Sequence, residues 1–70
     1  MKYTYTNQRQ IRKAFWDSHP IHEAYALKWG IKTAPHNRHN AETRMAFNTF
    51  IDRLEWNDEI SESLASRATL

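Results

Sequence analysis

Cysteine is absent from this 70-residue sequence, and glycine and proline occur only once and twice, respectively. The lack of cysteine excludes disulfide bonds and is typical of a reducing compartment. So few glycines disfavour a β-rich fold, because such folds depend on tight turns. No apolar run approaches the roughly 18 residues that a membrane span needs. We therefore expect a helical, soluble protein with a cytoplasmic location.

The small size of the chain limits its core. A chain of 8.4 kDa exposes about 12,000 Å² when unfolded and about 4,600 Å² when folded, so folding buries roughly 60% of its surface. Stability is then marginal unless large side chains compensate. The sequence carries three Trp, three Phe and three Tyr, which bury much area per residue. A symmetric homodimer, which would hide some of these rings, is an alternative way to stabilise the chain.

Charge is divided unevenly along the chain. Residues 1–44 hold eight Lys and Arg against three acids, a net of +5, whereas residues 45–70 hold two against five, a net of −3. All four histidines lie in the basic part. This asymmetry favours a surface for an anionic partner. The alternative is that the two parts attract each other, or attract a second copy.

Capping signals predict the first two helices. Asn7, with Gln10 three residues later, matches a capping box and opens a helix that runs to about Ser18. Pro20 disfavours helical geometry in the residue before it and suits the start of a second helix. Gly30 predicts the end of that helix through a left-handed conformation. The apolar positions of the second helix are Ile21, Ala24, Tyr25 and Leu27.

The second part of the chain predicts two more helices. Asn40 caps a helix over 41–56, and Asn57–Asp58 ends it and caps a last helix that runs to about Arg67. The apolar stripe of the longer helix is Phe47, Phe50, Ile51 and Leu54. Residues 1–6 predict an extended arm or short strand, and 31–40 a basic, His-rich loop. The expected fold is an all-α, compact bundle of three to four short helices in a single domain over 1–70.

Basic side chains recur at helical spacing on the first predicted helix. Three cations and a tryptophan follow at i, i+3, i+4 and i+7, on one side of that helix. Cations beside an exposed aromatic side chain suit phosphates and stacked bases; the alternative is that the cations are merely solvated and that Trp16 belongs to the core. The loop 31–40 extends this surface with three further basic side chains. The predicted partner-binding residues are Arg9, Arg12, Lys13, Trp16, Lys32, Arg38 and His39.

The histidines form two H-x-x-H pairs separated by thirteen residues. With Cys in place of His this would be the spacing of a zinc ribbon, because an x-x gap lets two side chains converge on one ion. Structural zinc sites nearly always include thiolates, and we expect the histidines of the 31–40 loop to be exposed. We therefore predict no metal and no other cofactor. A metal-binding module remains an alternative, with ligands His19, His22, His36 and His39.

Motifs for catalysis are absent. The sequence has no Gly-rich phosphate loop, no G-x-S-x-G and no H-E-x-x-H. A pocket of useful volume is also hard to build in so small a core. We predict a protein that binds a partner and is not an enzyme. If that partner itself binds nucleic acid, acidic side chains could act instead as phosphate mimics: Asp52, Glu55, Asp58, Glu59 and Glu62.

Two stretches resemble small uncharacterised accessory proteins of phages and other mobile elements. One runs over 14–20 and the other over 41–47, continuing through Ile60–Ser61 to 67–70. The resemblance covers about half of the chain and implies a protein that binds and blocks a host factor, including a nuclease-based defence complex, in the host cytoplasm. No functional residues are carried over with it. It favours occlusion of a protein or protein–nucleic-acid complex, with direct DNA or RNA binding through the basic part as the alternative.

Overall fold

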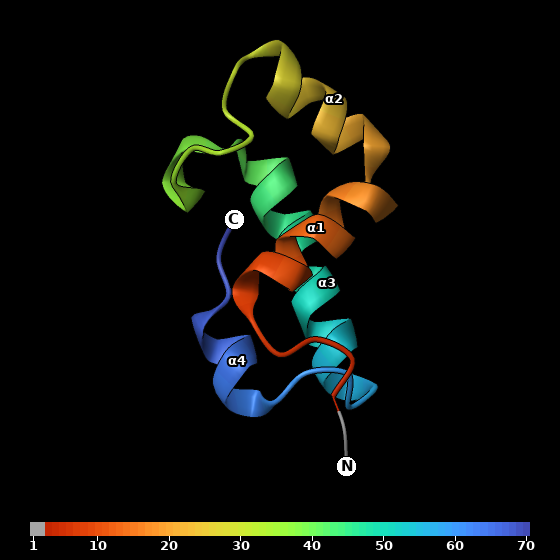
Figure 1. Ribbon diagram of the computed structural model, residues 1–70. Helices are drawn as coiled ribbons and strands as arrows, with labels where there is room; N and C mark the ends of the chain where they lie inside the picture. The colour runs from red at the N-terminus through yellow and green to blue at the C-terminus, as the bar shows by residue number, and fades with distance from the viewer. Residues whose placement is uncertain (1–2) are drawn as a thin grey trace.

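The computed structural model describes residues 3–70 as a helical protein without strands in that range (Figure 1). Its elements are α1 (Gln8–Ser18), α2 (Pro20–Lys28), the short 3₁₀ helix η1 (His36–Arg38), α3 (Ala41–Trp56) and α4 (Glu62–Arg67). The predicted all-α bundle is therefore confirmed. The predicted arm forms no strand over residues 3–6, and its first two residues lie outside the described range. No helix within 3–70 is both long and apolar enough to cross a membrane.

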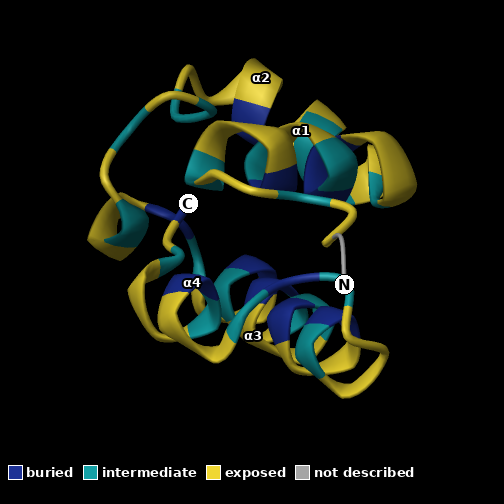
Figure 2. Ribbon diagram, turned by 60° about the horizontal axis from the view of Figure 1, so that its bottom comes forward, coloured by how far each residue is buried: buried dark blue, intermediate teal, exposed yellow. Residues whose placement is uncertain are grey.

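The core lies between two layers, with α1 and α2 on one side and α3 and α4 on the other (Figure 2). Phe15 of α1 and Phe47 of α3 are both 0% exposed, and their rings meet edge to face with centroids 5.2 Å apart. Aromatic pairs in this geometry stabilise a core beyond the area that they bury. The other buried apolar residues are Ile11, Trp16, Ala26, Ile51, Leu54, Ile60, Leu64 and Leu70. The stripe predicted for α3 thus faces the core, with Phe50 half-buried at its edge.

Side-chain caps start three of the four α-helices. Asn7, Asn40 and Ser61 each accept a hydrogen bond from the backbone N–H three residues later. The capping box of α1 is shifted by one residue. In the predicted motif the Gln10 side chain accepts a hydrogen bond from the N–H of the cap residue Asn7, whereas here it accepts from the N–H of Thr6 at 2.7 Å. These bonds satisfy amides that have no partner inside the helix. The starts of α1, α3 and α4 are therefore set by local hydrogen bonds.

The end of α2 follows the prediction for Gly30. This residue has φ +67°, the left-handed region that glycine enters without steric cost. The N–H of Ile31 donates to the carbonyl of Ala26 at 2.9 Å, and that of Gly30 to the carbonyl of Leu27 at 3.2 Å. This pair of bonds is a Schellman motif, and it turns the chain into the 31–40 loop.

The connection between α3 and α4 corrects the prediction that Asn57–Asp58 caps the last helix. Asp58 has φ +56°, and the N–H of Glu59 donates to the carbonyl of Leu54 at 2.8 Å. The segment is therefore a second Schellman motif that ends α3. The last helix begins four residues later, at Glu62, behind the cap Ser61. Asp and Asn favour both helix starts and left-handed helix ends, so composition alone does not distinguish the two.

The α2 helix buries less than its sequence predicts. Ala26 is its only buried residue, whereas Ile21 and Leu27 are 83% and 59% exposed. The side of α2 that faces the protein carries His22, whose Nδ1 lies 3.0 Å from the hydroxyl oxygen of Thr43 on α3. The predicted apolar positions therefore point away from the core.

Candidate partner-binding groove

A groove of about 600 Å³ lies between α1, the start of α2 and the 31–40 loop. We call it the basic groove. Five of the seven predicted partner-binding residues line it: Arg9, Arg12, Lys13, Trp16 and Lys32. The rest of its lining is Asp17, Glu23, Thr33, Ala34 and Leu70. The structure thus brings the basic side of α1 and the loop together around one concave surface.

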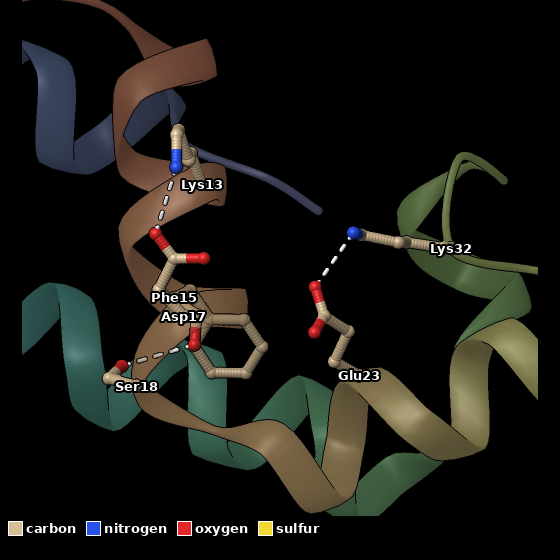
Figure 3. A network of polar contacts seen from close by, with 6 residues as sticks. All are labelled: Lys13, Phe15, Asp17, Ser18, Glu23 and Lys32. Carbon is tan, nitrogen blue, oxygen red and sulfur yellow. Dashed lines mark hydrogen bonds and ion pairs between the residues drawn. The ribbon is translucent and has the colours of Figure 1, made fainter.

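Two ion pairs lie on opposite sides of the basic groove (Figure 3). On α1, the ammonium of Lys13 is 3.0 Å from a carboxylate oxygen of Asp17, and both side chains are exposed. Across the groove, the ammonium of Lys32 is 2.7 Å from a carboxylate oxygen of Glu23, and this pair is about two-thirds buried. With its two arginines the groove has four cations and two acids. Its net charge is +2, and its surface carries both signs.

The two arginines of the groove differ in how many hydrogen bonds hold their side chains in place. Nε of Arg12 donates to the carbonyl of Thr69 at 2.7 Å, and its Nη2 donates to Oε1 of Gln8 at 3.0 Å. Arg9 is exposed and has no hydrogen bond or ion pair with any side chain in the described range. Arg12 therefore holds the C-terminal segment against α1, while the Arg9 guanidinium is available to a partner.

Trp16 corrects the expectation of an exposed aromatic side chain. It is 5% exposed, its ring packs edge-on against Phe15 at 5.0 Å, and the ring of His39 lies 5.6 Å away. His39 is itself 2% exposed, with Nε2 3.2 Å from the carbonyl oxygen of Ala34, so the expected exposure of this histidine is also wrong. The loop folds back over α1 and covers both rings. Trp16 is the floor of the groove and offers no open face for a stacked base.

The two other basic residues of the loop lie apart from the groove lining. Arg38 is exposed on η1. His36 is half-buried, and its Nδ1 accepts a hydrogen bond from the N–H of Leu70 at 3.2 Å. Burial lowers the pKa of His36 below 6.5, and the neighbouring Arg44 and His39 lower the pKa further. Neutral His36 therefore fastens the C-terminal segment beside the groove.

The two H-x-x-H pairs are not combined into one site. Among residues 3–70, no three His, Asp or Glu side chains are arranged so that they could hold a metal ion. The ring of His19 stacks on Phe15 at 4.4 Å, and Nδ1 of His19 lies 3.0 Å from the carbonyl of Phe15. His22 instead contacts Thr43, and the remaining pair belongs to the loop. Packing and hydrogen bonding account for the positions of these rings.

The acidic residues of the C-terminal part lie outside the lining of the basic groove. The predicted phosphate-mimicking residues are exposed or half-buried, and none makes an ion pair within residues 3–70. Trp56 lies in the same segment, at the end of α3, and is 87% exposed. Its exposure can be predicted from helical spacing, because it lies half a turn of helix away from Phe47 in the buried stripe.

The two carboxylates of the basic groove, Asp17 and Glu23, were not predicted as site residues. Lys13 and Asp17 are four residues apart on a helix, and this spacing alone predicts an ion pair. Glu23 and Lys32 lie on either side of the turn at Gly30, and no local pattern brings them together. The acids matter because they turn a uniformly basic stripe into a surface of mixed charge.

Comparison with known proteins identifies no relative: no protein-family model matches the chain, and no curated protein or solved structure matches it.

Proposed function

We propose that this protein is a non-enzymatic binding protein that occludes a protein partner through its basic groove. The supporting observation is the mixture of groups in the groove. The apolar lining of the groove is Ala34 with the small exposed edges of Trp16 and Leu70, and it lies between cations that are interleaved with two carboxylates. Interfaces between proteins commonly combine an apolar centre with a polar, charged rim. The expected occupant is a protein segment with an apolar side chain flanked by acidic and polar groups.

The same carboxylates disfavour a nucleic acid in the groove. Asp17 and Glu23 would each repel a phosphate, and they already engage Lys13 and Lys32. A stacked base would also need an open aromatic face, and Trp16 is 5% exposed. A protein segment avoids the first obstacle because its amide and ammonium groups can donate to the carboxylates, and it does not depend on an aromatic face for stacking.

The resemblance to phage accessory proteins indicates what kind of partner the groove would bind. A small protein without catalytic groups acts on a larger factor by covering a surface that the factor needs. We propose that the factor belongs to the host, with a nuclease-based defence complex as one example. In a complex that contains both protein and nucleic acid, the groove would bind the protein component.

Direct nucleic-acid binding is the second candidate, supported by two exposed guanidinium groups. Arg9 and Arg38 have no side-chain partner within residues 3–70 and are free to contact phosphates. Such contacts supply most of the affinity in non-specific binding and weaken steeply with salt. This candidate predicts retention on DNA or RNA at low salt that disappears at physiological salt.

A capture experiment with and without nuclease separates the two candidates. The immobilised protein is exposed to a lysate of the host cell, and the double variant Arg9→Glu with Lys13→Glu serves as the groove variant. A matched control, Arg53→Glu with Arg67→Glu, reverses two exposed cations outside the groove. We expect one protein species that survives nuclease, is retained by the control and is lost from the groove variant. Capture that vanishes entirely after nuclease treatment would favour nucleic acid.

A further inference from the structure

An exposed apolar row runs along the outward side of α2. Ile21, Tyr25 and Trp29 follow one another at intervals of four residues, and they are 83%, 42% and 61% exposed. The rings of Tyr25 and Trp29 lie 6.2 Å apart, and Nζ of Lys28 lies 5.7 Å from the centre of the Trp29 ring. We call these three residues the outward row. Figure 2 shows α2 as exposed along most of its length, with one buried band.

Within one chain α2 buries little of its surface. The helix has nine residues, fewer than the roughly 12–15 that an isolated helix needs for stability in water. It buries only Ala26 completely. In one copy the exposed parts of the three side chains of the outward row amount to about 400 Å², given their exposed fractions and the roughly 150–250 Å² that a large side chain presents when free. A dimer through the row would bury about 800 Å² in total from these side chains, the size of a weak interface.

We propose that the outward row is covered by a second copy of this chain, in a symmetric dimer with antiparallel α2 helices. A two-fold axis beside Tyr25 pairs Ile21 of one copy with Trp29 of the other, and places the two Tyr25 rings together. The row therefore complements itself, as a two-fold interface requires. At both ends of the interface, the Trp29 ring of one copy then packs against the Ile21 side chain of the other.

Charges around the outward row are compatible with self-association. The outward side of α2 carries one charged residue, Lys28, and no acid. In the antiparallel pairing the two Lys28 side chains lie toward opposite ends of the interface. Glu23 lies on the other side of the helix and remains paired with Lys32. The dimer therefore buries rings and aliphatic chains without bringing like charges together at its centre.

The geometry also leaves the basic groove open in the dimer. Glu23 lines the groove, and it is 200° around the helix from Ile21 because each residue advances by 100°. A dimer would present two grooves, and a repetitive partner would bind more tightly than to a single copy. This consequence rests on the proposed function of the groove. The dimer itself does not, and its test uses no groove partner.

Sedimentation equilibrium of the full chain, from micromolar to about 1 mM, tests the dimer. We expect a monomer–dimer equilibrium in the wild type. Ile21→Glu should raise the dissociation constant at least about tenfold, because it places a charge against an apolar ring. Met45→Glu adds the same charge at an exposed apolar site on α3 and should leave the dissociation constant unchanged. Circular dichroism checks that both variants keep their helices.

Two further variants test the antiparallel arrangement. The double variant Ile21→Glu with Trp29→Lys sets opposite charges against each other across the two-fold axis, and should recover dimer lost in Ile21→Glu. Since the chain has no cysteine, Tyr25→Cys introduces a single thiol beside the axis, and it should cross-link on mild oxidation far faster than Trp56→Cys. A wild type that stays monomeric at about 1 mM would overturn the proposal. So would equal weakening by Ile21→Glu and Met45→Glu, or equal cross-linking of the two cysteine variants.

Discussion

The ammonium of Lys32 lies 2.7 Å from the carboxylate of Glu23 and joins the 31–40 loop to α2. A partly exposed ion pair of this kind contributes about 0–1 kcal/mol to stability. Its larger effect is on the surface, because it places a carboxylate inside a groove that is otherwise basic. Together with Asp17 it gives the groove two acids among four cations. We propose that the arrangement of both signs, more than the net charge, determines which partner fits.

Removing the two carboxylates should change the preference of the groove. Asp17→Asn with Glu23→Gln leaves four cations and no acid, so retention on DNA or RNA at low salt should rise and depend more steeply on salt. Capture of the protein partner should weaken, because two acceptors are lost. Filter binding at several salt concentrations measures the first effect, and lysate capture measures the second. Unchanged nucleic-acid retention together with unchanged protein capture would show that the acids do not select the partner.

The stability of the folded protein should depend strongly on Phe47 and hardly on Trp56. Phe47 is 0% exposed and contacts Phe15, so Phe47→Ala should cost about 3–5 kcal/mol of unfolding free energy, enough to unfold a domain of this size. Trp56 is the larger side chain but is 87% exposed, so Trp56→Ala should stay within about 0.5 kcal/mol of wild type. Urea titration followed by circular dichroism measures both. A large loss for Trp56→Ala would contradict the arrangement of α3.

Gly30→Ala should measure how much unfolding free energy is lost when a residue other than glycine adopts a left-handed backbone conformation. A Cβ at this position would meet no atom within 4 Å, so no clash contributes. The remaining cost comes from φ +67° and should be about 1–2 kcal/mol. The measurement is the urea midpoint at constant m-value. A neutral effect would show that α2 ends differently in solution.

Acid should weaken the attachment of the C-terminal segment through His36. Its Nδ1 accepts from the N–H of Leu70, so protonation removes this bond. The folded pKa is lowered by burial and then by Arg44 and His39, so the unfolded chain binds more protons below pH 6.5. The stabilisation is fully present above pH 6.5 and is lost as the pH falls through the lowered pKa.

Urea midpoints measured over this pH range test the role of His36. His36→Asn keeps an acceptor in a similar position but does not titrate in this range, and it should flatten the pH dependence. Hydrogen exchange at the amide of Leu70 gives a local measurement of the same bond. Identical pH profiles for the wild type and His36→Asn would contradict the assignment.

Local signals predicted the framework of the fold. The caps Asn7 and Asn40, the helix start at Pro20 and the left-handed Gly30 all act within a few residues, so the sequence alone shows them. Asp58 was misread because its residue type suits both a helix start and a left-handed helix end. The burial of α2 could not be predicted, because it depends on which side of the helix meets α3.

The candidate site was predictable only in part, because some of its residues are placed by contacts between segments that lie apart in the sequence. The basic side of α1 follows from helical spacing, and five of the predicted residues line one groove. Trp16 and His39 were expected on the surface, but the loop folds back over α1 and buries both. The pairing of Glu23 with Lys32 likewise depends on the path of the chain after Gly30. These are contacts between segments, which no local pattern encodes.

The affinity of the captured partner for charge-reversed variants tests the central claim most directly. The groove variant Arg9→Glu with Lys13→Glu is compared by calorimetry with the acidic-surface variant Asp52→Lys with Glu62→Lys, which reverses two exposed acids outside the groove. We predict that the groove variant loses at least about tenfold in affinity while the acidic-surface variant binds like wild type. Retained affinity in the groove variant, with loss in the acidic-surface variant, would contradict the account.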